Sequence, residues 1–328
     1  MRQIQLYISQ TTDPYFNLAT EQYLLENQPV DSCTLYLWQN ENTVVIGRNQ
    51  NPWKECRVSA LEQDGGRLAR RLSGGGAVFH DLGNLNFTFL TREENYDLDS
   101  QLSVIQCACG SLGIATERSG RNDLLADGRK FSGNAFYNHK GLAYHHGTLL
   151  IRVDGEKLQR YLSPPKAKLE AKGIDSVRSR VINLADLCPD LTCETMKEAM
   201  IEAFRQIYDA PMHTITLSPG QLEQIQDLRK KYADWQWLFG PRLPMSFSCQ
   251  QQFPWGNVLL ELQVDSGTVA AARCYTDAMD WLLADAVEAS LTGCRFTLPD
   301  LQQALQAHLS NLPQILQDLL TLLQAQDI

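Results

Sequence analysis

The segment from Arg70 to Asp81 has the residue types and spacing best suited to binding an anion. It reads Arg-Arg-Leu-Ser-Gly-Gly-Gly-Ala-Val-Phe-His-Asp, with two arginines shortly before three consecutive glycines. Such glycines are costly inside a helix or strand, but they let a loop present several backbone N–H groups to a phosphate. The arginines add planar donors for carboxylates and phosphates. The segment matches neither the Walker A nor the dinucleotide-binding pattern, so a flexible turn remains an alternative to an anion-binding loop.

A second group of polar residues lies between Gly120 and Ala135. Lys130 falls in a stretch that alternates like a strand, so we expect it to share one face with Ser132. A lysine held rigidly there could neutralise a carboxylate and a phosphate that react with each other. Asp123, next to Asn122, could hold a magnesium ion that coordinates phosphate oxygens. The alternatives are a solvated lysine and a turn-capping aspartate.

A third signal is the pair His145-His146, which precedes a strand-like run from Gly147 to Val153. Paired histidines suggest metal binding or acid–base chemistry. No glutamate completes a His-Glu-x-x-His pattern, so we expect a structural or pocket-lining role instead. The chain also has no Gly-x-Ser-x-Gly elbow and no cysteine in a context typical of a nucleophile, which argues against a covalent acyl-enzyme.

Composition narrows the class of protein. The 328 residues include 29 basic and 38 acidic side chains, for a formal charge of −9, so we expect no nucleic-acid partner. Nine cysteines without a Cys-x-x-Cys pair predict reduced thiols in the cytoplasm. The N-terminus lacks the pattern of a secretory signal, and no apolar run approaches the ~20 residues that span a bilayer. We therefore expect a soluble, cytoplasmic monomer without a membrane partner.

The elements that must position these residues form an α+β pattern. Asp13-Pro14 predicts the start of a helix that runs to about Glu26. Further helices are predicted over 100–113, 194–208 and 280–291, and strands over 35–38, 43–47, 86–90 and 129–136, with a polar turn after the first strand. A second unit begins near Phe247, with a hairpin turning at 265–267 and a leucine-rich helical stretch broken at Pro313. The predicted domains are 1–246 and 247–328.

Together these segments resemble the lipoate–protein ligase A family. The resemblance is dense over residues 1–185, and the length and the small C-terminal unit fit the bacterial two-domain form. The matching segments are Asp13–Ala19, Val44–Arg48, Asn51–Cys56, Arg70–Asn84, Gly120–Leu124, Arg129–Ala135, His145–Leu150 and Ala171–Val181.

The resemblance implies a fold shared with biotin protein ligases, in which a mixed β-sheet is flanked by helices and joined to a small C-terminal α+β accessory domain. It implies that lipoate and MgATP react to give lipoyl-AMP and pyrophosphate. The lipoyl group then passes to one lysine of an apo lipoyl domain, in E2 subunits of 2-oxoacid dehydrogenases or in the glycine cleavage H protein. Such a reaction salvages free lipoate.

The resemblance also implies roles for single residues. Lys130 would be the catalytic residue and would contact both lipoate and ATP. The expected ATP contacts are Arg71, Gly76, Ala77, Val78 and Phe79. Weaker candidates are Arg70, Ser73, Gly75, Asn84, Asn122, Asp123 and His146, with Asp123 as the magnesium ligand. The basic loop over 166–180 would close over the adenylate or meet an acidic lipoyl domain.

Three other functions compete with the ligase. An acyltransferase of the same fold would move octanoyl from acyl carrier protein without ATP, using a cysteine. Residues 247–328 and the lack of an evident cysteine site favour the ligase. A biotin protein ligase has different motifs around its glycines. A non-catalytic lipoate- or nucleotide-binding protein would not need Lys130 together with Arg70 and Arg71.

Overall fold

The computed structural model describes residues 3–120, 123–163, 181–240 and 246–326. It divides into two compact units. The N-terminal unit comprises Met1–Ile46, Trp53–Arg71 and Ala77–Leu238, and the C-terminal unit comprises Gly47–Pro52, Leu72–Gly76 and Phe239–Ile328. The predicted α+β class is confirmed, because a large mixed sheet with helices forms the first unit and a small α+β fold forms the second.

The main sheet of the N-terminal unit has the described strand order β11-β1-β2-β6-β10-β9-β8-β7. Strand β1 pairs in parallel with β2 and β11, and the other neighbours are antiparallel. The strands are β1 (Gln3–Ile8), β2 (Ser32–Trp38), β6 (Asn84–Arg92), β7 (Glu117–Ser119), β8 (Asp123–Ala126), β9 (Arg129–His139), β10 (Leu142–Leu150) and β11 (Met212–Thr214).

One face of this sheet is apolar and forms one side of the unit's hydrophobic core. Leu35, Leu37, Phe87 and Phe89 lie on it and pack against α4 (Leu98–Ser111) and α7 (Cys193–Tyr208), which cover the same face. Side chains of a strand alternate between the two faces of its sheet. The residues between these apolar positions therefore point to the other face, and most of them are polar yet buried.

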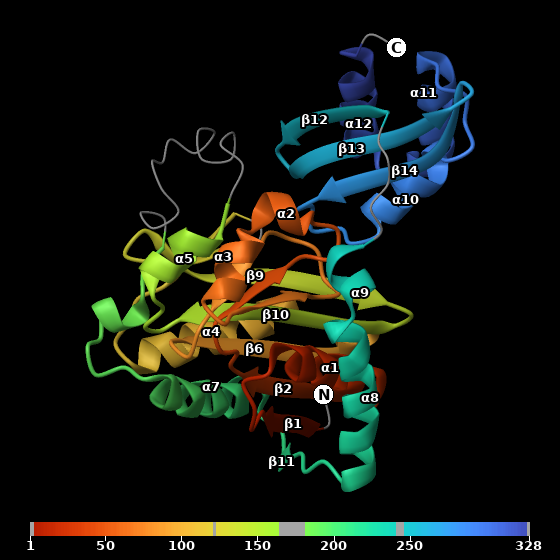
Figure 1. Cartoon of the computed structure of the whole chain (residues 1–328). Coiled ribbons are helices and arrows are strands. Elements are labelled where there is room, and N and C mark those ends of the chain that lie inside the picture. Colours follow the sequence, from red (N-terminus) through yellow and green to blue (C-terminus); the bar gives the residue numbers. More distant parts are fainter. Residues whose placement is uncertain (1–2, 121–122, 164–180, 241–245, 327–328) are drawn as a thin grey trace. The chain divides into compact units, whose positions relative to one another are not determined.

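Helix α1 (Pro14–Glu26) covers the polar face, and α8 (Pro219–Ala233) lies beside it (Figure 1). The predicted start of α1 is confirmed, since the Asp13 carboxylate accepts a hydrogen bond from the N–H of Tyr15 and Pro14 occupies the first turn. The unit's other helical segments are α3 (Val58–Gln63), α5 (Gly155–Tyr161), α9 (Trp235–Phe239), η1 (Glu93–Asn95) and η3 (Leu184–Asp186).

A small second sheet contains the strands that precede and follow the three glycines at 74–76. Its order is β4 (Arg67–Arg70), β3 (Thr43–Ile46) and β5 (Val78–His80). The two strands predicted on either side of a polar turn therefore lie in different sheets: β2 pairs with β1 and β6, whereas β3 pairs with β4 and β5. Helix α2 (Pro52–Glu55) follows β3 in the chain.

The C-terminal unit has a sheet of β12 (Phe247–Phe253), β13 (Gly256–Asp265) and β14 (Thr268–Thr276). The predicted hairpin is confirmed: Ser266 and Gly267, both with positive φ, form its turn. Helices α10 (Leu283–Leu291), α11 (Leu298–Leu309) and α12 (Pro313–Gln324) pack their leucines on this sheet. Pro313 begins α12, which explains the break predicted there.

Two segments from early in the sequence belong to this C-terminal unit. The N–H of Gly75 donates to the carbonyl of Ala278 at 3.1 Å, and the N–H of Thr276 donates to the carbonyl of Asn49 at 2.9 Å. A Cβ on Gly74 would lie 2.3 Å from the Ala278 oxygen. The glycine at position 74 therefore permits a close approach of two backbones.

Among the helices that the structure describes, none has the length and apolar character needed to cross a membrane.

Candidate active site

Lys130 lies at a bulge in β9. Two consecutive residues of β8 pair with Lys130 and Ser132, which leaves Phe131 as an extra residue. The predicted shared face of Lys130 and Ser132 is wrong because of this bulge: Phe131 and Ser132 are both fully buried, whereas Lys130 is partly exposed. A Cβ on Gly133 would lie 2.8 Å from Lys130 Nζ. The lysine therefore shares its face with Gly133.

The ammonium group of Lys130 forms an ion pair with Asp123. Its Nζ lies 2.7 Å from Oδ1 of Asp123, and the two side chains are 31% and 22% exposed. Asp123 is the cross-strand neighbour of Gly133, whose missing side chain leaves room for the ammonium. Thr148, on β10, accepts a hydrogen bond from the N–H of Gly133 at 3.3 Å. This pair of opposite charges is thus accessible to a ligand and lies at one end of the polar face.

The residues around Asp123 decide whether the expected magnesium ion could bind there as a resident metal. Among the described residues there is no group of three or more His, Cys, Asp or Glu side chains that could hold a metal. Magnesium bound with a nucleotide commonly takes one or two protein carboxylates together with phosphate oxygens and water. A single carboxylate such as Asp123 matches the protein share of such a nucleotide-bound ion, and it does not by itself form a site for a resident metal.

A buried polar cluster lies further along the same face, where α1 covers β6 and β10. Oε1 of Glu21 lies 2.8 Å from Nδ1 of His146 and accepts from the hydroxyl of Thr88 at 2.7 Å. All three residues are at most 6% exposed. The ring of Tyr144 packs against that of His146 at a tilt of 40°, with the centroids 4.7 Å apart. His146 lies inside β10, and the expectation that the two histidines precede a strand is wrong.

Arg71 and His80 border this cluster from the small sheet. Nη1 of Arg71 donates to the carbonyl of Val45 at 3.2 Å. Burial lowers the pKa of Arg71 to about 10, while Tyr144 and Glu21 act in the opposite direction. Burial, with further contributions from Arg71 and His146, lowers the pKa of His80 to about 3. At neutral pH the Arg71 guanidinium is therefore still a cation, whereas the imidazole of His80 is neutral.

Two asparagines of β6 complete the polar face. Nδ2 of Asn84 donates to Oδ1 of Asn86 at 2.8 Å. Both residues are buried, and Oδ1 of Asn84 and Nδ2 of Asn86 have no hydrogen-bond partner among the described residues. Buried amides without partners are uncommon. These two atoms can therefore bind a polar group of a ligand.

Other predicted residues point elsewhere. Arg70 donates to the carbonyl oxygens of Trp237 (2.9 Å) and Leu238, and Trp237 Nε1 donates back to the Arg70 carbonyl at 3.0 Å. The ring of Phe79 packs on Tyr161, 5.4 Å between centroids. Arg70 and the Phe79 side chain therefore stabilise the packing of the N-terminal unit.

The remaining predicted residues divide between the two units. Ser73, Gly75 and Gly76 belong to the C-terminal unit. Ala77 and Val78 belong to the N-terminal unit and are half-buried, and Val78 is the first residue of β5. Asn122 and the basic loop over 166–180 lie outside the described residues.

Sequence reasoning missed several residues of the polar face. Glu21, Thr88, Tyr144 and Asn86 were not predicted, and His80 was noted only as part of a motif. A signal for Glu21 existed, because this charged residue stands among buried positions of α1, between Ala19 and Leu24. Alternating polar residues in β6 and β10 were a second signal. Their convergence depends on strand order, which the local sequence does not show.

The polar face is long enough for an extended small molecule. Lys130 is on β9, and the ring of Trp38 on β2 lies 6.1 Å from that of His80. The order β9-β10-β6-β2 separates the two strands by three strand spacings, ~14 Å. The anionic-ligand end, at Lys130, and the aromatic end, at Trp38, are thus separated by about the length of a medium-chain acid.

Two family models match this chain. The model of the lipoyl protein ligase A/B catalytic domain matches residues 13–205, and that of the bacterial lipoate protein ligase C-terminus matches residues 243–322. LipL1 of P. falciparum, solved in complex with lipoate, is 28% identical with a TM-score of 0.83, covering 97% of this chain and 99% of that one.

Two further solved structures share the fold. The bipartite lipoate protein ligase of Thermoplasma acidophilum, studied with its E2 lipoyl domain, is 25% identical with a TM-score of 0.66, over 75% of this chain and 100% of that one. A lipoate-protein ligase A bound with ATP is 24% identical with a TM-score of 0.64, over 73% and 99%. The catalytic-domain match spans more than half of the chain, and the protein belongs to the lipoyl protein ligase A/B family.

Proposed function

We propose that this protein is an ATP-dependent lipoate–protein ligase that carries out both half-reactions. It would join lipoate and ATP to form lipoyl-AMP with release of pyrophosphate, and then transfer the lipoyl group to a lysine of an apo lipoyl domain. The observation that carries the proposal is the accessible Lys130–Asp123 pair at the end of a buried polar face. An anionic acid and a nucleotide can meet at this pair, whereas the rest of the face can receive the acyl chain.

In the first half-reaction, a carboxylate oxygen of lipoate attacks the α-phosphorus of ATP and the bond to pyrophosphate breaks. Two anions must approach each other, so a preorganised cation should contribute most to the rate. Lys130 supplies this cation, since Gly133 leaves space for its ammonium on the polar face. Asp123 would hold the magnesium ion that enters with ATP, which neutralises phosphate charge. Arg71 and the backbone over 76–79 remain our proposed ATP contacts.

In the second half-reaction, the acceptor lysine's amine attacks the lipoyl carbonyl and AMP leaves. Charge develops on the carbonyl oxygen and on the departing phosphate, and Lys130 would stabilise both. The proposed acceptors are the E2 subunits of 2-oxoacid dehydrogenases and the glycine cleavage H protein. The T. acidophilum relative, studied with its E2 lipoyl domain, supports this class of acceptor, and the lipoate-bound P. falciparum relative supports the acyl substrate.

A cysteine-dependent acyltransferase is the main alternative. Burial raises the pKa of Cys33, Cys56 and Cys109, and likewise of Cys193, Cys249 and Cys274. A raised thiol pKa disfavours the thiolate that such an enzyme needs. Cys33 also points to the core face of the main sheet, away from Lys130.

The test is acylation of an apo E2 lipoyl domain, followed by mass spectrometry in three reactions, which distinguishes a lipoyl from an octanoyl product. These contain lipoate with MgATP, lipoyl-AMP alone, and octanoyl acyl carrier protein alone. We expect product in the first two reactions and none in the third. Product from lipoyl-AMP only would mean that the protein catalyses the transfer step but not the adenylation of lipoate. Product from the carrier protein only would replace the ligase with the acyltransferase.

A further inference from the structure

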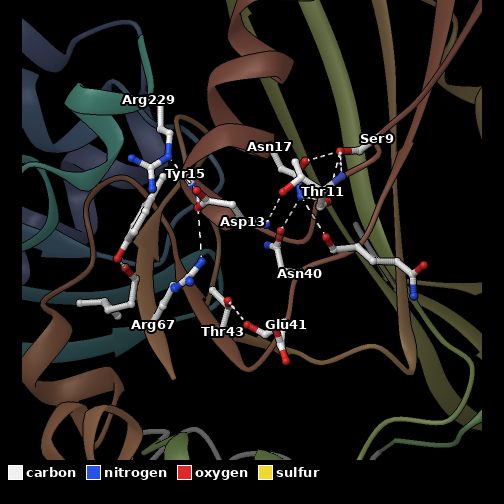
Figure 2. Close-up of polar contacts among 12 residues, drawn as sticks. Ser9, Thr11, Asp13, Tyr15, Asn17, Asn40, Glu41, Thr43, Arg67 and Arg229 are labelled. Carbon is white, nitrogen blue, oxygen red and sulfur yellow. Dashed lines mark hydrogen bonds and ion pairs between the residues drawn. The ribbon is translucent and has the colours of Figure 1, made fainter. Parts of the chain in front are cut away.

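The amide orientation of Asn17, in α1, is fixed by its neighbours. Its Nδ2 donates to the carbonyl oxygens of Thr11 at 3.1 Å and Gln39 at 2.9 Å. Its Oδ1 accepts from the hydroxyl of Ser9 at 2.6 Å. Because carbonyl oxygens only accept, a flipped amide would set the Asn17 oxygen against two other oxygens. Figure 2 shows this buried side chain directed at Asn40.

Asn40 transmits this orientation to His80. Oδ1 of Asn40 accepts from Asn17 Nδ2 at 3.0 Å, and Nδ2 of Asn40 lies 3.2 Å from Nδ1 of His80. Nδ2 of Asn17 carries donors only, so an Asn40 NH₂ group turned toward it would set two donors against each other; Asn40 therefore turns its oxygen to Asn17 and its NH₂ group to His80. Nδ1 of His80 therefore accepts. Burial, Arg71 and His146 keep the ring neutral by lowering the pKa of His80 to about 3, so its single proton is on Nε2.

The Nε2–H group of His80 is a buried donor without a hydrogen-bond partner among the described residues. The residue is 3% exposed, and its ring packs edge-on against Trp38. An unpaired buried donor is destabilising unless a bound group accepts from it. Trp38 lies three strand spacings from the strand of Lys130. Because the ring of His80 packs against Trp38, its donor lies toward the β2 side of the polar face, away from the strand of the Lys130–Asp123 pair.

We infer that Asn17 and Asn40 are positioning residues that hold His80 in its Nε2–H form, and that His80 thereby donates a hydrogen bond to the sulfur-bearing end of bound lipoate. This inference rests on the proposed function, in which the lipoate carboxylate lies at Lys130. A ring sulfur is a weak acceptor, whereas the methyl end of octanoate accepts nothing. A site with a buried donor disfavours a ligand that leaves the donor unpaired. His80 therefore favours lipoate over octanoate.

The tautomer can be tested without any ligand, by ¹⁵N–¹H long-range correlation NMR of the full chain labelled at histidine. We expect His80, assigned by loss of its signals in His80→Leu, to carry its proton on Nε2 alone. The isosteric variant Asn40→Asp can only accept from the ring, so we expect a proton on Nδ1. Asn311→Asp, an exposed site, controls for the added charge. A wild-type proton on Nδ1, or no change in Asn40→Asp, would overturn the relay.

Recognition is tested by calorimetric binding of lipoate and of octanoate to the wild type and to His80→Leu. We expect roughly threefold to tenfold weaker lipoate binding in the variant, as for loss of one buried hydrogen bond, with octanoate changed less than twofold. An equal loss for both acids would mean a purely structural role and would refute recognition by His80. A wild type that binds neither acid would refute the proposed function instead, while the tautomer result would still stand. If the variant does not fold, the wild-type Nε2–H resonance must shift with lipoate and not with octanoate.

Discussion

At the scale of single residues, the position of the Lys130 ammonium depends on Gly133 having no side chain. Gly133 faces the lysine across the bulge of β9, and a Cβ there would lie 2.8 Å from Nζ and 3.0 Å from Cε. The nearest obstacle is the flexible end of a side chain, not backbone. A methyl group at this position would therefore displace the ammonium more readily than it would disturb the sheet.

We predict that Gly133→Ala impairs lipoate adenylation by about 10²-fold, because small displacements of a reacting group can cost that much. The free energy of unfolding should change by no more than about 1 kcal/mol, since the lysine can move aside. Urea titration and adenylation rates measured on the same preparation separate the two effects. Gly110→Ala, where a Cβ meets nothing within 4 Å, is the matched control. Full activity in Gly133→Ala would contradict the assigned position of Lys130.

Two buried histidines predict how stability depends on pH. Burial is the main cause that lowers the pKa of His80 and of His145 to about 3, from an ordinary 6.5. Below pH 6.5 the unfolded chain therefore binds protons that the native state does not, and stability falls as pH falls. Between pH 7 and pH 5 each ring should cost about 2 kcal/mol.

Denaturant unfolding at the two pH values measures this loss. His145→Gln should have a smaller difference between pH 7 and pH 5 than the wild type, whatever its stability at pH 7. His213→Gln, at an exposed position, should behave like the wild type. An unchanged difference in His145→Gln would show that this ring is protonated in the native state.

At the scale of elements, the start of α1 is held by contacts to two other elements. Oδ2 of Asp13 lies 2.7 Å from Nε of Arg229 on α8, and Oδ1 lies 3.5 Å from Nη1 of Arg67 on β4. Oδ1 also accepts the N–H of Tyr15 as the helix cap, and Figure 2 shows these groups around Asp13. One carboxylate thus caps α1, which carries Asn17 and Glu21, and fixes it to its neighbours.

Two substitutions at Asp13 separate the cap from the charge. Asp13→Asn keeps a capping oxygen and loses the ion pairs, so unfolding should become easier by about 1 kcal/mol or less. Asp13→Ala also loses the cap, which costs about 1 kcal/mol more. Thermal and urea unfolding at low and at high salt measure both. Equal effects of the two substitutions would mean that the cap contributes nothing.

The local sequence predicted many of the helices, strands and turns, but it predicted fewer of the pairings between strands. The capped start of α1, the hairpin at 265–267 and the helix break at Pro313 all follow from local chemistry, and all are confirmed. The bulge at Phe131 and the placing of β2 and β3 in different sheets depend on partner strands far along the chain. For the same reason Lys130 was predicted from its motif, but its neighbour Gly133 and the buried cluster around Glu21 were not.

At the scale of the whole molecule, the chain forms two units, and each unit is made of three separate segments of the sequence. Segments 47–52 and 72–76 pack with the C-terminal unit although their flanking strands belong to the N-terminal unit. Sequence patterns predicted a second unit from Phe247 but not these two segments, since their partners near Ala278 lie more than two hundred positions away. Arg48 follows the same pattern, with Asp285 at 3.5 Å and Trp281 beneath its guanidinium.

We predict that Gly74→Ala weakens the packing of residues 72–76 within the C-terminal unit. The new Cβ would lie 2.3 Å from the Ala278 oxygen and 2.8 Å from that of Met279, which are both backbone atoms. Hydrogen exchange of the Gly75 amide should become tenfold faster or more, as for a local opening made easier by about 1.4 kcal/mol. Gly220→Ala, in open space, should leave exchange there unchanged. Unchanged protection in Gly74→Ala would contradict the close backbone approach.

The most direct test of the proposed function is lipoate-dependent exchange of labelled pyrophosphate into ATP, with Lys130→Ala as the comparison. We expect exchange that requires lipoate and falls by roughly 10²–10³-fold in the variant, as for removal of one preorganised charge. Exchange that persists undiminished in a folded Lys130→Ala protein would contradict the role of this lysine. No exchange in a folded wild type that binds lipoate would contradict the adenylation step itself.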